Sequence, residues 1–247
     1  MRFLFTLLCA AMTLSLPLFA QGLDDMTDQD RKAFRAEIRA YLLENPEVLM
    51  EAIGVLERRQ QEAKANQDVA LVDQYRATIL DDGFSYVGGN PDGDITLVEF
   101  IDYRCTYCRK AHDDVAELIT SDGNIRFVVK EFPILGEQSM LSSQLAVAVL
   151  HKAGPEKYEE IGDFLMTFNG NLTDSAIAKI LARFDLDPAE ITAYMDDPAV
   201  MGHIGKVHEL AGRLAISGTP TFVIGDDMVR GFVPLDNLRA IVAQNRG

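Results

Sequence analysis

The sequence predicts an α/β domain with a helical insertion, preceded by an N-terminal helical arm. Three observations predict this class. The N-terminal region has only helical periodicity. The region after it alternates strand and helix patterns, and a long helical stretch interrupts this alternation. We assign the arm to residues 21–81, the domain to residues 82–247, and the insertion to residues 137–215 approximately.

Residues 1–20 have the pattern of a secretory signal peptide. Arg2 gives a basic start, residues 3–19 are almost wholly apolar, and Ala20 is a small residue near which cleavage can occur. The alternative is a membrane anchor, but the apolar stretch is short for a bilayer span, which needs about 20 residues. We therefore expect an exported protein.

The arm has two helical segments. Thr27, followed three residues later by Asp30, has the pattern of a helix N-cap, and Asn45-Pro46 restarts a helix that can continue to Leu80. An isolated arm of this kind cannot bury its own apolar positions. We expect the arm to self-associate; the alternative is that its helices fold back onto the main domain.

The domain alternates strands and helices around a turn cluster at residues 88–94. Its predicted strands are residues 95–101, 125–132, 221–224 and 228–232, and its predicted flanking helices are residues 106–120 and 235–244. The order is βαβ, a helical insertion, and ββα. Pro155, Pro188 and Pro198 divide the insertion into several helices.

The cysteines indicate thiol chemistry. Cys9 belongs to the signal segment, which leaves Cys105 and Cys108 in a C-x-x-C pattern between a strand and a helix. A bridge across so short a loop contributes little stability. At a helix N-terminus the unpaired N–H groups and the helix dipole stabilise a thiolate. We predict that Cys105 attacks and that Cys108, one turn later, resolves the product.

Other chemistries are less well supported. A structural zinc site needs four ligands, and the sequence has no second C-x-x-C and only four scattered histidines, which we expect to be exposed or locally bonded: His112, His151, His203 and His208. Binding of Cu(I) by two thiolates stays open. The formal net charge of −15 argues against nucleic acid as a partner.

The segment V-E-F-I-D-Y-R-C-T-Y-C-R-K, together with G-T-P-T-F-V-I, resembles the DsbA-like branch of thioredoxin-fold proteins. This resemblance implies that Pro220 follows a cis peptide bond and faces the cysteines, and that the Thr219 backbone pairs with a substrate peptide. It also implies that Glu99 is a buried acid that exchanges a proton with Cys108. Lys130 is a candidate partner for Glu99, and a solvent-facing Glu99 is the alternative.

The arm sequence, including I-R-A-Y-L-L-E-N-P-E-V-L-M-E, resembles that of ScsC-like and Com1-like members. This implies a periplasmic disulfide isomerase that acts on exported client proteins as a homo-oligomer and is reset by a membrane redox partner. The alternatives are a monomeric disulfide oxidase and a copper-binding protein. We expect no metal and no cofactor beyond the redox-active disulfide between Cys105 and Cys108. Thr106 departs from the residues common in that position and leaves the redox potential open.

Overall fold

The computed structural model describes residues 26–246, so the predicted signal peptide lies outside the described residues. The chain divides into two compact units, with the boundary after Gln60. Within residues 26–246, no helix is both long enough and apolar enough to cross a membrane.

The first unit contains helix α1 (Asp28–Glu44) and the beginning of helix α2 (Glu47–Leu80). The side chain of Thr27 accepts a hydrogen bond from the N–H of Asp30, and the Asp30 carboxylate accepts one from the N–H of Thr27. This capping box confirms the predicted helix start. The helix ends at Asn45, whose N–H donates to the Tyr41 carbonyl, and α2 begins directly after Pro46.

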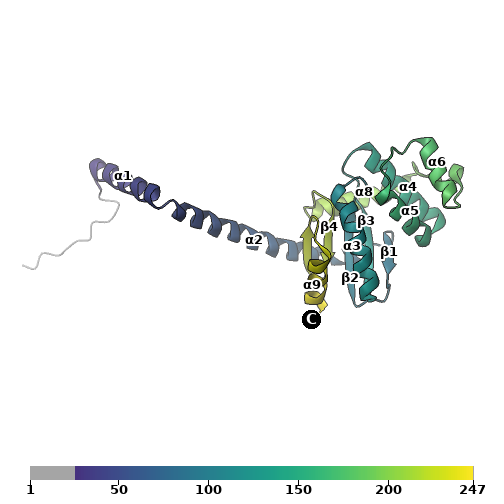
Figure 1. Ribbon diagram of the computed structural model, residues 1–247, viewed down its shortest axis with the longest axis horizontal. Helices are drawn as coiled ribbons and strands as arrows, with labels where there is room; N and C mark the ends of the chain where they lie inside the picture. The colour runs from purple at the N-terminus through teal and green to yellow at the C-terminus, as the bar shows by residue number, and fades with distance from the viewer. Residues whose placement is uncertain (1–25, 247) are drawn as a thin grey trace, which may run out of the picture. The chain divides into compact units, whose positions relative to one another are not determined.

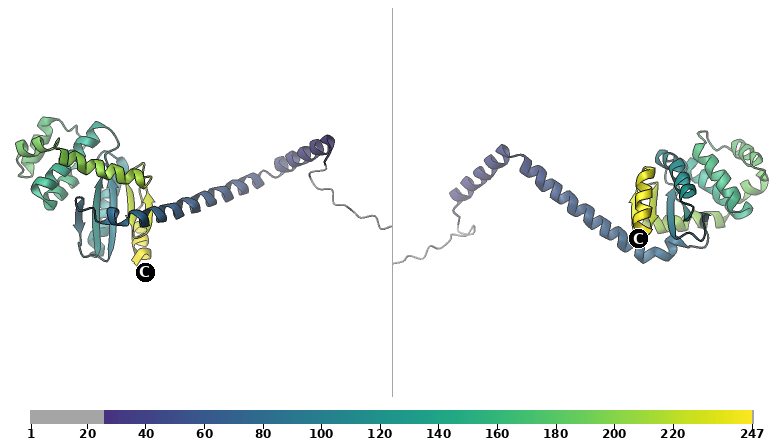
Figure 2. Two further views of the ribbon diagram at one scale, coloured as in Figure 1. Left: turned by 180° about the vertical axis from the view of Figure 1, so that it is seen from behind. Right: turned by 60° about the horizontal axis from the view of Figure 1, so that its bottom comes forward.

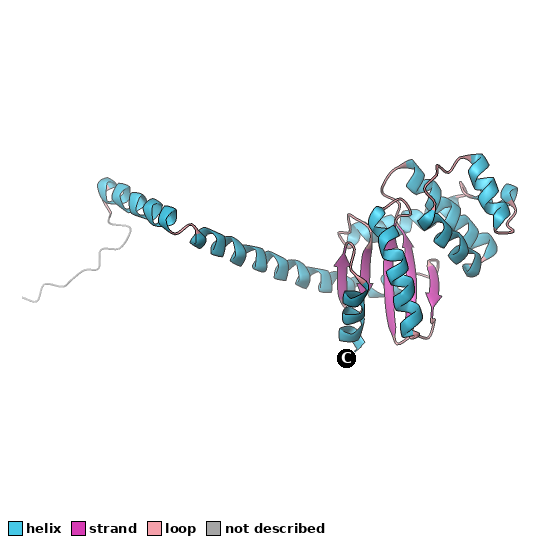
Figure 3. Ribbon diagram, viewed as in Figure 1, coloured by secondary structure: helices cyan, strands magenta, loops and turns pink. Residues whose placement is uncertain are grey.

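The second unit is built on one mixed sheet with the strand order β1-β3-β2-β4-β5 (Figures 1 and 3). The strands are β1 (Tyr86–Gly89), β2 (Ile95–Ile101), β3 (Ile125–Glu131), β4 (Thr221–Ile224) and β5 (Asp227–Arg230). Strands β2 and β3 are parallel, and the other neighbours are antiparallel. The sequence predicted four of these strands.

Strand β1 was not predicted from the sequence. It has four residues, two of which are glycines, and Gly89 has a φ of 64°. Such a segment has the composition of a turn. It becomes a strand because it pairs with β3 at the edge of the sheet, which is a tertiary effect.

Helices cover both faces of the sheet. Alternate side chains of β2 point to opposite faces, so each face carries apolar groups that a helix can bury. Leu97 packs with α3 (Thr106–Asp122) and α9 (Leu235–Arg246) on one face. Val98 and Phe100 pack with α8 (Pro198–Arg213) on the other, as the left view of Figure 2 shows for α8. The end of α2 joins this second core through buried Val72 and Ile79. The second unit therefore begins at Gln61, well before the boundary placed at residue 82 from the sequence.

The insertion consists of α4 (Glu137–Ala153), α5 (Pro155–Thr167), α6 (Asp174–Arg183), α7 (Pro188–Tyr194) and α8. The prolines predicted to divide it do so, since Pro155, Pro188 and Pro198 each occupy the first turn of a helix. Asp187 and Asp197 cap the last two of these helices. The insertion shares a core with the loop between β2 and α3, because Tyr103 packs in it.

Candidate active site

The two cysteines lie at the start of α3, directly after β2. Cys105 is the N-cap residue, with extended backbone angles (φ −74°, ψ 120°), and its N–H donates to the carbonyl of Asp102. Cys105 is 7% exposed, whereas Cys108, one helical turn later, is 0% exposed. Only the first sulfur is therefore accessible to a partner molecule.

The environment separates the pKa values of the two thiols. A hydrogen bond from the Cys108 thiol, a second from the Thr219 side chain, and the N–H groups of Cys108 and Tyr107 lower the pKa of Cys105 to about 5, against the effect of burial. The same thiol–thiol hydrogen bond, burial and the charge of Glu99 raise the pKa of Cys108. At neutral pH, Cys105 is thus a thiolate and Cys108 a thiol.

We expect the Cys105 thiolate, followed by its absorbance at 240 nm in the reduced protein, to titrate near pH 5. The variant Cys108→Ala removes the largest cause of the shift, so its titration should move toward pH 9, the ordinary thiol value. In Cys108→Ser a hydroxyl donor is kept, and a smaller shift is expected. If Cys108→Ala titrated like the wild-type protein, the thiol–thiol hydrogen bond would not be the cause.

The segment before β4 lies against the attacking sulfur. The Thr219–Pro220 peptide bond is cis, as the resemblance implies. The carbonyl oxygen of Thr219 lies 3.1 Å from the Sγ of Cys105, and the thiol form donates to it. Thr219 is partly exposed and Pro220 is buried. A substrate that reaches the Cys105 sulfur therefore also meets the backbone of Thr219.

Glu99 lies on β2 and is 4% exposed, so the expectation of a buried acid agrees with the structure. Burial, followed by the negative charge of Cys105, raises the pKa of Glu99 to about 8. Its predicted ion pair with Lys130 is wrong. Lys130 is in register with Phe100, whose side chain occupies the opposite face of the sheet, and its Nζ lies 2.6 Å from the carboxylate of Asp82.

We expect Glu99 to destabilise the reduced protein increasingly as the pH rises. Its folded pKa of about 8 lies above the ordinary value of 4.5, so folding favours the protonated form. This stability is fully present below pH 4.5 and is lost as the pH rises through 8. Relative to Glu99→Gln, the wild-type free energy of unfolding should fall by about 1.4 kcal/mol per pH unit in that range. Urea unfolding of both proteins at several pH values measures this difference. If the free energy of unfolding had the same pH dependence in the wild type and in Glu99→Gln, the prediction would be contradicted.

Two polar anchors that the sequence analysis missed fix the loop between β2 and α3. Asp102 is fully buried and accepts hydrogen bonds from the N–H groups of Arg104, Ile134 and Leu135. The guanidinium of Arg109 donates to the carbonyl oxygens of Tyr103 (2.7 Å) and, in the insertion, Phe168 (2.6 Å). Both residues lie inside the segment around the C-x-x-C motif, but each also bonds a partner distant in the sequence: Ile134 and Leu135 for Asp102, and Phe168 for Arg109.

A third anchor is the buried carboxyl of Glu131 at the end of β3. It accepts hydrogen bonds from the hydroxyl groups of Tyr103 (2.8 Å), Tyr158 (2.6 Å) and Ser143 (2.7 Å). The three donors come from the active-site loop, α5 and α4, so Glu131 joins the insertion to the loop that carries Cys105. Burial raises the pKa of Glu131 to about 7.

The histidines provide no metal centre with the cysteines. Among residues 26–246, no group of three or more His, Cys, Asp or Glu side chains is arranged to hold a metal ion. His151 and His203 do contact each other, with 3.3 Å between ring nitrogens. His203 is 4% exposed and contacts His151, so it is buried but locally bonded.

Comparison with known proteins agrees with this geometry. The family model for thioredoxin matches residues 81–244, and the model for the N-terminal domain of the copper resistance protein ScsC matches residues 30–63. A thioredoxin-like oxidoreductase from Silicibacter pomeroyi is 37% identical, with a TM-score of 0.65, over 69% of this chain and 97% of that one.

Two further structures extend over both units of the chain. BcfH from Salmonella enterica Typhimurium is 27% identical with a TM-score of 0.75, and covers 89% of this chain and 97% of its own. Proteus mirabilis ScsC in a transitional conformation is 26% identical with a TM-score of 0.65, and covers 90% and 98%.

Among the curated relatives, disulfide bond formation protein D from Bacillus subtilis is 21% identical over 164 residues, or 62% of this chain and 73% of that protein. Other curated relatives are antiporters. A Na⁺/H⁺ antiporter NhaA from Salinispora arenicola is 28% identical over 164 residues, or 66% of this chain. The chain spans only about a quarter of the length of such relatives, since the match covers 25% of that protein. The thiol geometry and the two family matches together establish that the chain belongs to the thioredoxin family, as a DsbA-like thiol–disulfide oxidoreductase of the ScsC type.

Proposed function

We propose that this protein is an exported disulfide isomerase that works as a homo-oligomer in the periplasm. The observation that carries the thiol chemistry is the pairing of an accessible Cys105, with its pKa lowered to about 5, and a fully buried Cys108. Cysteine-containing client proteins are the substrates, and a membrane redox partner returns the pair to its working state.

The reaction begins with the Cys105 thiolate. It attacks one sulfur of a client disulfide, so that a mixed disulfide forms and the other client sulfur leaves as a thiolate. If a different client thiolate attacks the client sulfur of the mixed disulfide, Cys105 leaves as a thiolate and the client keeps a new pairing, with no net change of electrons. If Cys108 attacks instead, the client is reduced and Cys105 and Cys108 are oxidised to a disulfide.

Exposed apolar side chains next to Cys105 support an unfolded client as substrate. Tyr107, within the C-x-x-C segment, is 60% exposed, and Leu135 is 55% exposed. Leu135 is held beside the active-site loop because its N–H donates to Asp102. Together with the backbone of Thr219, these side chains offer an extended peptide both apolar contact and a hydrogen-bonding edge.

Self-association is supported by the first unit, in which no residue of α1 is buried. Nine of its large apolar side chains are 39–68% exposed, and they are Phe34, Ile38, Tyr41, Leu43, Leu49, Met50, Ile53, Val55 and Leu56. So much apolar surface marks an interaction site. Association of copies through it places several Cys105 thiolates around one client, which favours reshuffling of wrong disulfides.

Scrambled ribonuclease tests the proposal when native mass is measured in parallel. We expect the wild-type protein to be an oligomer and to restore ribonuclease activity in a thiol buffer. Ile53→Glu/Leu56→Glu should give a monomer that loses isomerisation but still oxidises reduced clients. The control Glu57→Gln/Glu62→Gln changes exposed polar residues of the same helix and should behave as wild type. A monomeric wild-type protein that only oxidises clients would instead identify a disulfide oxidase.

A further inference from the structure

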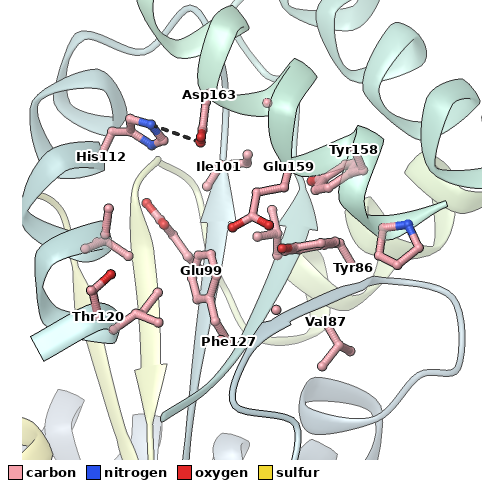
Figure 4. A pocket seen from close by; sticks show the side chains of 18 of the residues that line it. Tyr86, Val87, Glu99, Ile101, His112, Thr120, Phe127, Tyr158, Glu159 and Asp163 are labelled. Atoms are coloured by element: carbon pink, nitrogen blue, oxygen red, sulfur yellow. Dashed lines mark ion pairs between the residues drawn. The ribbon is translucent and has the colours of Figure 1, made fainter. Parts of the chain in front are cut away.

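A cavity of about 740 Å³ lies on the α3 face of the sheet, and Cys105 is not among the residues that line it (Figure 4). Its walls come from β1, β2, β3, α3 and α5, so it lies where the insertion meets the thioredoxin-like sheet. Its volume falls in the range of about 300–1,000 Å³ that is typical of small-molecule sites.

Apart from its tyrosines, most of the ionisable side chains that line this cavity are acidic. Its acidic residues are Glu99, Glu156, Glu159 and Asp163, and among the described residues that line it there is no lysine or arginine. His112 is the one basic side chain in that lining, and its Nε2 lies 3.3 Å from the Asp163 carboxylate, as the dashed line in Figure 4 marks.

Glu99 is an independent indication of a ligand. Its side chain lines the cavity although the residue is 4% exposed. Within residues 26–246, no side chain or backbone group donates a hydrogen bond to its carboxyl. An N–H donor in the cavity would satisfy the carboxyl in either of its protonation states.

The remaining walls suit a flat apolar body. Tyr86 and Tyr158 are stacked with 4.5 Å between ring centroids, and Phe127 and Ile101 add further apolar surface. Aromatic faces attract cations through the ring quadrupole. Negative charge, an unsatisfied carboxyl and aromatic walls therefore select the same ligand class.

We propose that this cavity binds a small organic cation that carries an amidinium, guanidinium or ammonium group on a flat apolar body. The cationic head lies between Glu99, Glu159 and Asp163, and the apolar body lies against Tyr86 and Phe127. The proposed occupant undergoes no reaction, and this proposal does not rest on the proposed isomerase activity.

Calorimetric titration of the reduced full-length protein with benzamidine and with benzamide tests the site. The two probes share their shape, but only benzamidine is charged at neutral pH. We expect benzamidine to bind at least tenfold more tightly than benzamide. Equal affinities, or no binding of benzamidine at millimolar concentration, would overturn the proposal.

Three variants locate the binding. Glu159→Gln/Asp163→Asn removes two exposed charges of the cavity and should weaken benzamidine at least tenfold. Ala116→Trp keeps every charge but fills the cavity from an exposed position of α3, and should abolish binding. Asp185→Asn/Glu190→Gln removes two exposed charges outside the cavity and should leave the affinity unchanged. Unchanged binding in the first two variants would place benzamidine elsewhere and refute the assignment.

Discussion

Replacing Cys105 with serine is expected to reduce disulfide exchange to the uncatalysed rate. The hydroxyl of serine is not ionised at neutral pH, whereas the pKa of Cys105 is lowered to about 5. Since the thiolate is the attacking species, no mixed disulfide can form in the variant. Reduction of insulin, followed by turbidity, and refolding of scrambled ribonuclease both measure the loss.

Cys108→Ser is the matched control, because it changes the same atom type one helical turn away. It keeps the attacking thiolate but removes the thiol that displaces a bound client. Mixed disulfides through Cys105 should accumulate and be visible on non-reducing gels. Full activity of Cys105→Ser, or mixed disulfides through Cys108, would show that the roles of the two cysteines are wrongly assigned.

Asp82→Asn is expected to destabilise the protein by about 3–5 kcal/mol. The Nζ of Lys130 lies 2.6 Å from Asp82, and the two side chains are 0% and 4% exposed. The amide oxygen of asparagine can still accept from the N–H of Ser85, as the carboxylate does. The main change is therefore an ammonium group left buried without a counter-charge. The midpoint of urea unfolding measures the effect.

Two controls distinguish charge burial from general disturbance. Adding Lys130→Met to Asp82→Asn removes the unpaired charge and should recover part of the lost stability. Glu160→Gln breaks the exposed pair of Lys157 and Glu160, in which 32% and 47% of the side chains are accessible, and should cost less than about 1 kcal/mol. Equal effects of Asp82→Asn and Glu160→Gln would contradict a buried ion pair.

Local signals in the sequence were enough to predict the elements that carry the thiols. The apolar run of β2 and the C-x-x-C segment at the start of α3 are contiguous in the chain, so their chemistry follows from helix geometry alone. The prolines that begin α5, α7 and α8 act through their own fixed φ angle, so these helix starts could also be predicted from the sequence.

The tertiary structure decided everything that depends on which face or which partner a residue meets. The sequence around Glu99, between Val98 and Phe100, does not show whether its side chain is buried. The register of β2 with β3 places Glu99 and Lys130 on opposite faces of the sheet. Strand β1 forms because its backbone pairs with β3 at the edge of the sheet. The cavity beside Glu99 arises where α5, distant in the sequence, packs near α3. Local propensity acts over a few residues, whereas pairing, facing and burial are set by contacts between segments that the chain separates.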